Sequence, residues 1–436
     1  MWLHLVVRWR SEEFRALFVR TRHFVLGAAL TGAVTGFAVA GFERLTVNVV
    51  FDDVVSKLPV VLLALAPFVG LAVATVWLRG PGRGLDRATA DAYLDAFHDD
   101  RRLSVRDLVN KLVAAVATLG SGGAMGLEGP SIYLGASLGA VAQRRFVRFF
   151  GGADRNLLLV AGAAAGIAAI FKAPATGAIF AIEVPYQDDL ARRMLLPALV
   201  AAASGYLALV AVNGTAPLFP VNGLPALSFV DLAGAAGLGL VAALGARTFA
   251  WMLLAAKRIA DRGHAAIRVA AAGGAIATLF AIGRSLTGES LVLTPGYGVV
   301  TWALDPKRSV AILLAMLVLR CLATTATVSG GGVGGLFVPL VVAGALLGRA
   351  FGLVVGGNDA LFLVIGIAAF LGAGYRVPLA AIMFVAETTG RPGFVVPAVI
   401  AAVVAELVMG SSSVTTHQVR STPGAAPAVR EPPDRD

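Results

Sequence analysis

Uncharged, apolar stretches alternate with short charged segments along almost the whole chain. The stretches cover residues 24–41, 58–78, 112–127, 129–143, 156–171, 194–230, 232–246, 269–283, 321–348, 360–375 and 392–405. Several are shorter than the roughly 20 residues that a straight helix needs to cross a bilayer. The pattern predicts an all-α, polytopic membrane protein whose helices differ in length.

Glycine and proline interrupt many of these stretches, at positions 126, 129, 130, 174, 335, 339 and 378. A helix that ends inside the hydrocarbon leaves backbone groups unpaired, and this is tolerated only where protein or a water-filled cavity satisfies them. Broken helices of this kind are typical of transport sites. The interruptions therefore favour a transporter or channel of tilted and broken helices over a simple membrane anchor.

Two blocks of sequence occur twice, in the same order. Gly126-Leu-Glu-Gly-Pro130 matches Gly335-Leu-Phe-Val-Pro339, and Phe171-Lys-Ala-Pro174 matches Tyr375-Arg-Val-Pro378. Chance matching in Ala- and Gly-rich sequence is the alternative, but two ordered blocks that each contain a proline favour an internal duplication. We expect a first repeat at about 23–215 and a second at about 230–417, in inverted orientation with the substrate between them.

The composition agrees with a protein embedded in the membrane. Of 436 residues, 58% are hydrophobic and 14% are charged, and the mean hydropathy is +0.81. No ordinary soluble domain reaches these values, because its surface must be polar. The net charge of +10 lies in short clusters between the apolar stretches, as in loops that flank membrane spans, so nucleic acid is not an expected partner.

The ends of the chain differ from its middle. Residues 1–22 contain five arginines before the first apolar stretch and predict a cytoplasmic basic segment, either a helix on the membrane surface or a disordered tail. Residues 23–417 form the predicted membrane domain. Residues 418–436 are rich in Pro, Ala and charge and predict a disordered tail. The Ala- and Arg-rich composition suggests a bacterial inner (plasma) membrane.

Metal and disulfide chemistry are not indicated. The one cysteine, Cys321, has no partner for an intramolecular bridge, and the five histidines show no metal-site spacing. An enzyme is not expected either, since no His-Glu-x-x-His, Gly-x-Ser-x-Gly or paired intramembrane aspartates occur. No cofactor is predicted.

One carboxylate, Glu128, lies in an otherwise uncharged run from residue 112 to 143. Burying its charge in hydrocarbon costs several kcal/mol, so an ionisable residue there is a functional hypothesis by default. Pro130 suits the first turn of a helix. A helix start in mid-membrane offers unpaired N–H groups and the positive end of a dipole, so it can bind an anion without any basic side chain. Glu128 could itself occupy that site as a tethered anion; the alternative is a protonated structural glutamate in a helix break.

The second repeat contains the same kind of helix start. Gly330-Gly-Gly-Val-Gly-Gly-Leu-Phe-Val-Pro339 is not a phosphate-binding P-loop, because no Lys-Ser/Thr follows the glycines. Two such helix starts that face each other would surround a dehydrated anion with backbone amides. Phe337 takes the place of the glutamate, as a gate or cavity wall or as a plain packing aromatic.

These residues resemble the CLC family of chloride channels and proton/chloride antiporters. Gly126–Pro130 is similar to its G-[KR]-E-G-P motif, with leucine at the usual basic position, and Gly335–Pro339 is similar to its G-x-F-x-P motif. Leu293-Thr-Pro-Gly-Tyr-Gly298 also looks like a family stretch, and the order matches from about residue 23 to 419. The resemblance implies the CLC-type inverted repeat and a homodimer with one anion pathway per subunit.

The same resemblance implies the site residues. Glu128 corresponds to the external gating glutamate. The anion would be bound by backbone amides around the two helix starts; these residues are Gly126, Leu127, Glu128, Gly129, Pro130, Gly335, Leu336, Phe337 and Val338. The implied partners are chloride or other small monovalent anions, and membrane lipid.

The sequence departs from the family pattern at three positions. The family's first motif supplies a serine hydroxyl to the anion; here spacing places that position near Ala88 or Thr89. The family's C-terminal tyrosine is absent from residues 411–417, and Thr415 is the expected counterpart. The internal glutamate of the antiporters follows the residue equivalent to Glu183, and here that next residue is Val184.

A valine cannot carry a proton, so Val184 favours passive, channel-like conduction of chloride gated by Glu128. The alternative is a proton-coupled chloride antiporter, favoured by the retained Glu128, with Glu183 or an internal water chain in place of the missing glutamate. A fluoride-selective variant also stays open, because the serine is missing. Glu183 itself is expected to bond neighbouring helix ends.

Overall fold

The structure is a computed structural model that describes residues 2–85, 87–99, 101–146, 154–216, 218–219 and 228–420, with side chains from residue 23 onward. Within these ranges the chain is helical, with two isolated β-bridges. The helices of the first half are α1 (Trp2–Glu43), a π-helix (Arg44–Asp52), a 3-10 turn (Val55–Lys57), α2 (Val60–Arg79), α3 (Thr89–His98), α4 (Val105–Gly120), α5 (Glu128–Arg145), α6 (Leu157–Phe171), α7 (Pro174–Glu183), a 3-10 turn (Arg192–Met194) and α8 (Leu195–Asn213).

The second half continues with α9 (Phe229–Arg262), α10 (Ala265–Thr287), α11 (Tyr297–Ala303), α12 (Val310–Ser329), α13 (Phe337–Val355), α14 (Asp359–Tyr375), α15 (Pro378–Thr389), a 3-10 turn (Pro392–Phe394) and α16 (Val395–Met409). Eight helical segments of the described chain are long and apolar enough to cross a membrane. The prediction of an all-α integral membrane protein is confirmed.

The shortest apolar helices form the core. Every residue of α6 is buried, and so is every residue of α14 from Leu361 onward. α5 packs on α6 through glycines, since a Cβ on Gly135 would lie 2.0 Å from the carbonyl oxygen of Gly162. A Cβ on Gly344, where α13 packs on α14, would lie 2.4 Å from the carbonyl oxygen of Gly366. Small residues let the helix backbones approach closely, which is how membrane helices gain packing energy.

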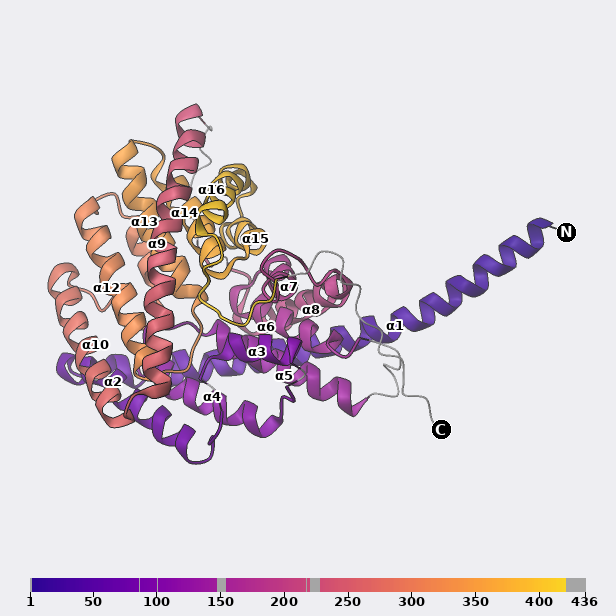
Figure 1. The fold of residues 1–436 in the computed structure, drawn as a ribbon, viewed down its shortest axis with the longest axis horizontal. Coiled ribbons are helices and arrows are strands. Elements are labelled where there is room, and N and C mark those ends of the chain that lie inside the picture. Colours follow the sequence, from indigo (N-terminus) through magenta and orange to yellow (C-terminus); the bar gives the residue numbers. More distant parts are fainter. Residues whose placement is uncertain are drawn as a thin grey trace.

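The two halves of the chain are related by inversion. α14 begins beside the end of α13, where Arg349 pairs with Asp359, and ends at Tyr375, whose carbonyl oxygen accepts the Gln418 amide at 2.8 Å. α13 therefore ends on the face opposite the C-terminal segment. α5 ends on the same face as that segment: Arg144 donates to the carbonyl oxygen of Leu103, which follows α3, and α3 contacts the C-terminal segment through Asp95 and His417. Figure 1 shows the two sets of helices, magenta and orange, side by side.

The second duplicated block makes a sharp break between two helices in each half. Lys172 and Arg376 end α6 and α14 in the left-handed conformation, with φ of 54° and 58°. A proline then opens the next helix, α7 or α15. The repeat recognised in the sequence is thus a repeat of backbone geometry.

Regular structure and bundle contacts continue into both segments that the sequence separated from the membrane domain. α1 begins at Trp2, and its first half projects away from the bundle (Figure 1), while the side chains of residues 2–22 lie outside the described residues. At the other end, Val419 forms a bridge with Tyr186, and Gln418 is buried. The described chain is therefore bonded to the bundle past residue 417, and residues 421–436 of the predicted tail lie outside the described residues.

Candidate anion site

Two glycine-rich loops meet in the buried interior of the protein. Gly126 and Gly335 exchange both backbone hydrogen bonds, at 2.9 and 2.7 Å. The loops before them have the same geometry, since Gly122 and Gly331 adopt φ of +94° and +88°, which L side chains rarely adopt. The meeting of Gly126 with Gly335 places the starts of α5 and α13 against each other, as the duplication predicts.

Glu128 occupies the start of α13. Its Oε1 accepts the backbone N–H groups of Phe337 at 2.6 Å and Val338 at 3.2 Å, and the residue is fully buried. Its Oε2 has no hydrogen-bond partner among the described residues. The first N–H groups of a helix have no partner within the helix and carry partial positive charge, so they bind an anion. In this structure the carboxylate of the chain itself is that anion.

Three glycines make room for the carboxylate and its loop. A Cβ on Gly126 would lie 1.8 Å from Glu128 Oε2, and one on Gly335 would lie 2.1 Å from Oε1. A Cβ on Gly129 would lie 2.2 Å from the hydroxyl oxygen of Thr89. Real Cβ atoms do not approach heavy atoms this closely, so any side chain at these positions would displace Glu128 or the loops.

The remaining predicted residues lie around this point. Leu127 caps α5 and is buried, and Pro130 is the third residue of that helix. Leu336 caps α13 in the same way, and Pro339 is its third residue. The structure thus brings together the nine residues that were predicted from the two helix starts.

Phe337 packs in an aromatic cluster. Its ring centroid lies 4.5 Å from that of Phe171, 5.0 Å from that of Phe384, 5.6 Å from that of Phe180 and 6.3 Å from that of Tyr375. The side chain is fully buried. Of the two roles left open by the sequence, packing is the one that these contacts show in this conformation.

A cavity of about 230 Å³ leads toward Glu128 from the face that carries the C-terminal segment. Its buried lining residues include Gly334, Gly335 and Leu336, and its more exposed ones include Arg87, Asp261 at the end of α9, and His417. Thr89 lines it, and the Thr89 hydroxyl donates to the carbonyl oxygen of Gly334 at 3.3 Å. Spacing left Ala88 and Thr89 open as the hydroxyl position, and Thr89 is the one whose hydroxyl lies beside the loops.

Thr415 is placed away from this cavity. Its neighbours Val414, Thr416 and His417 line the cavity, whereas Thr415 is not among the described lining residues. The Thr415 hydroxyl accepts the backbone N–H of His417 at 3.3 Å. The geometry therefore does not bring the Thr415 hydroxyl to the helix starts.

Tyr375 is a cavity residue that sequence reasoning treated only as part of a repeat. It lines the cavity beside Leu336 and is 2% exposed. The available signal was its place directly before the break in the second repeat. A tyrosine is therefore present at the site, supplied by α14 and not by residues 411–417.

Glu183 and Glu387 cap each other's helices. Glu183, at the end of α7, accepts the N–H groups of Leu379 at 3.0 Å and Ala380 at 2.8 Å at the start of α15. Glu387, in α15, accepts the N–H groups of Ala175 and Thr176 at 2.9 and 2.7 Å at the start of α7. Both carboxylates bond neighbouring helix ends, as the sequence predicted for Glu183.

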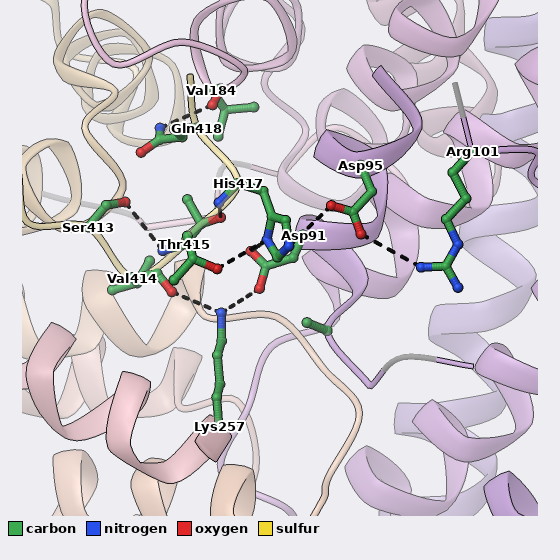
Figure 2. Close-up of polar contacts among 12 residues, drawn as sticks. Asp91, Asp95, Arg101, Val184, Lys257, Ser413, Val414, Thr415, His417 and Gln418 are labelled. Atoms are coloured by element: carbon green, nitrogen blue, oxygen red, sulfur yellow. Dashed lines mark hydrogen bonds and ion pairs between the residues drawn. The ribbon is translucent and has the colours of Figure 1, made fainter. Parts of the chain in front are cut away.

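Val184 is buried next to this pair. Its side chain has no titratable group, and its carbonyl oxygen accepts the Gln418 amide at 3.0 Å (Figure 2). The predicted internal proton position is therefore apolar, and both oxygens of the adjacent Glu183 are engaged with backbone.

Comparison with known proteins identifies the family. Residues 81–410 match the model of the voltage-gated chloride channel family. The chain belongs to the voltage-gated chloride channel (CLC) family. One relative is the H(+)/Cl(-) exchange transporter ClcA of Citrobacter koseri, 28% identical over 419 residues, which are 90% of this chain and 87% of that protein.

Solved CLC structures have the same fold. A CLC-type fluoride/proton antiporter aligns with a TM-score of 0.78 at 22% identity, covering 91% of this chain and 98% of that one. A slow cyanobacterial Cl-/H+ antiporter aligns with a TM-score of 0.75 at 21% identity, covering 89% of this chain and 94% of that one. The CLC inverted repeat predicted from the motifs is confirmed.

Proposed function

We propose that this CLC protein transports chloride across the membrane in exchange for protons. The observation that carries the proposal is the bond between the Glu128 carboxylate and the amides of Phe337 and Val338. An anion from solution can occupy these amides only after the carboxylate leaves them. A proton on Glu128 removes the negative charge that holds it there, so anion binding and proton binding are linked at one position.

The relatives support coupling over passive conduction. The C. koseri protein is named an H(+)/Cl(-) exchange transporter, and its similarity extends over 90% of the chain. Passive conduction, the function expected from Val184, has no support among these relatives. It remains the second candidate because Val184 is buried, apolar and unable to carry a proton.

The test is flux from liposomes that contain the purified protein. With chloride inside and the membrane potential clamped, we expect outward chloride movement to drive protons inward against their own gradient. A protonophore should abolish the resulting pH difference. Chloride efflux that never moves protons uphill would overturn the exchange function and favour the passive one.

Glu128→Gln separates the two fluxes. The amide resembles the protonated carboxyl and cannot be recharged, so chloride should pass while uphill proton movement falls by about 100-fold or more. Glu128→Ala should conduct chloride without dependence on pH. Proton movement at the wild-type rate in both variants would show that Glu128 is not the linking group.

Selectivity is tested in the same vesicles. The backbone amides at the two helix starts bind any small monovalent anion, so we expect chloride and nitrate to pass. Efflux of fluoride at a rate well above that of chloride would identify a fluoride-selective variant.

Assembly and orientation complete the proposal. We infer a homodimer in a bacterial plasma membrane, with the basic segment of residues 1–22 in the cytoplasm. The face that carries the C-terminal segment also carries Arg420, which bonds Gln187, and Arg192, which lies 3.9 Å from Asp189; these basic residues agree with the positive-inside rule. Cysteine labelling on either side of intact cells would test the orientation.

A further inference from the structure

The cavity that leads to Glu128 is lined by several titratable side chains. The described residues that line it include Asp91 at the start of α3, Lys257 and Asp261 at the end of α9, Arg87 before α3, and His417. Arg87 pairs with Asp261 at 3.2 Å, and Lys257 pairs with Asp91 at 2.5 Å. Arginine, lysine and paired carboxylates keep their charge near neutral pH, whereas an imidazole gains and loses a proton there.

His417 is held between two carboxylates (Figure 2). Its Nε2 lies 3.2 Å from Oδ1 of Asp95, and its Nδ1 lies 3.9 Å from Oδ1 of Asp91. Each carboxylate also has a cation behind it, because Lys257 of α9 pairs with Asp91, and Arg101 lies 3.7 Å from Asp95. These are the charged groups that α3, the loop after it and α9 direct at the imidazole.

The segment that carries His417 is fixed to the bundle. Val414 donates its N–H to the carbonyl oxygen of Gly374 at 2.9 Å, and Lys257 donates to the carbonyl oxygen of Val414 at 2.9 Å. On the other side, Gln418 donates to the carbonyl oxygens of Val184 and Tyr375. The chain on both sides of His417 is therefore bonded to the bundle, and 39% of the His417 side chain is exposed beside the cavity.

The far end of the cavity lies directly behind the Glu128 carboxylate. Gly335 lines the cavity, and a Cβ on Gly335 would lie 2.1 Å from Glu128 Oε1. The cavity therefore reaches the loop that contacts the Glu128 carboxylate. A cavity of about 230 Å³ is large enough for several water molecules, and its walls are partly polar.

We propose that His417 is the proton-exchange group on the cytoplasmic side, taking a proton from solution and passing it through the cavity to Glu128. In each transfer an imidazolium N–H bond breaks and an O–H bond forms on a water in the cavity. That water passes a proton on to the Glu128 carboxylate, and the neutral imidazole takes up the next proton from solution. His417 would thus supply the titratable group that is missing at Val184.

This inference rests on the proposed function. Flux measurements in the same liposomes distinguish failure of the inference from failure of the proposed function. The test compares wild type with His417→Gln, using chloride as the transported anion. We expect chloride to keep moving in His417→Gln while the number of protons moved per chloride falls roughly tenfold or more. His98→Gln is the matched control, because His98 bonds the carbonyl oxygen of Pro185 at 2.8 Å and is not among the described cavity-lining residues.

Each outcome has one meaning. Wild-type coupling that is kept in His417→Gln overturns the role of His417 and leaves the exchange function standing. A wild-type protein that moves no protons uphill overturns the exchange function, and with it this inference. Loss of coupling in His98→Gln as well would mean that any change on this face uncouples transport, and would also overturn a specific role for His417.

Asp95→Asn tests the same role without removing the imidazole. The carboxylates of Asp91 and Asp95 raise the pKa of His417 above its ordinary value, so the imidazolium persists to higher pH and is lost as pH rises through the raised pKa. Without the Asp95 charge that pKa falls. The proton-coupled rate should therefore decline at a lower cytoplasmic-side pH than in wild type, and an unshifted pH profile would contradict the role even if His417→Gln fails to fold.

Discussion

At the scale of single residues, glycine at position 126 is required by the position of a neighbouring carboxylate. A Cβ there would lie 1.8 Å from Oε2 and 2.4 Å from Cδ of Glu128, and both contacts are with one side chain. The Glu128 side chain can rotate away, whereas the backbone that pairs Gly126 with Gly335 cannot move without breaking both of its hydrogen bonds.

Gly126→Ala should therefore expel Glu128 from the amides of Phe337 and Val338. The clash is of the size that costs about 1–3 kcal/mol in packed cores, which is comparable to the bonds that hold the carboxylate. We expect faster chloride efflux with weaker pH dependence, measured as initial rates from liposomes. Gly274→Ala in α10 is the control, since no heavy atom lies within 4 Å of that Cβ. Identical efflux from both variants would contradict this account of the site.

At the scale of elements, α7 and α15 stabilise each other through exchanged caps. Each helix begins inside the bundle with a proline, and each receives the carboxylate of the other at its free N–H groups. Because the exchange joins the two repeats, the caps hold the halves of the molecule together around the anion site. Such capping by a distant residue cannot be read from local sequence.

Glu387→Ala should destabilise the protein more than a surface change. Loss of a helix cap costs about 0.5–2 kcal/mol, and buried donors left unpaired add about 1–3 kcal/mol. Glu387 also accepts the Thr176 hydroxyl at 2.7 Å. We expect a lower midpoint of thermal unfolding in detergent, with Glu289→Ala as the exposed control. Equal midpoints for the two variants would show that the caps contribute little.

At the scale of the whole molecule, a largely buried ion pair in the cavity wall connects the repeats. Asp91 comes from the first repeat and Lys257 from the second, and the pair is 2.5 Å long. Burial alone would raise the pKa of Asp91, but Lys257 and the neighbouring donors lower it below the ordinary range. The carboxylate is therefore charged throughout the working pH range, and its partner neutralises it beside the anion path.

Lys257→Met should remove the nearest cation from the Asp91 carboxylate. Breaking one side of a buried pair costs about 3–5 kcal/mol, whereas replacing both partners is often nearly neutral. We expect the single variant to unfold at lower temperature and to transport chloride more slowly, because the free carboxylate repels anions. Asp91→Asn combined with Lys257→Met should recover most of the stability. A double variant as unstable as the single one would show that Lys257 acts through Val414 and not through Asp91.

The sequence by itself determined the membrane class, the duplication and the two helix starts. Each of these follows from local sequence. Long apolar runs show which segments lie in the lipid bilayer, and glycine followed by proline shows where a helix begins. Glu128 could also be identified from local sequence. A carboxylate in an uncharged run is costly to bury, so its presence there indicates a functional site.

Only the tertiary structure decided which polar groups share the cavity. Thr415 was expected there as the counterpart of the family's C-terminal tyrosine, but its hydroxyl accepts the backbone N–H of His417, and Tyr375 lines the cavity instead. The contact of His417 with Asp91 and Asp95 joins residues more than three hundred positions apart. Such contacts depend on how the helices pack, and they cannot be predicted from the local sequence around either residue.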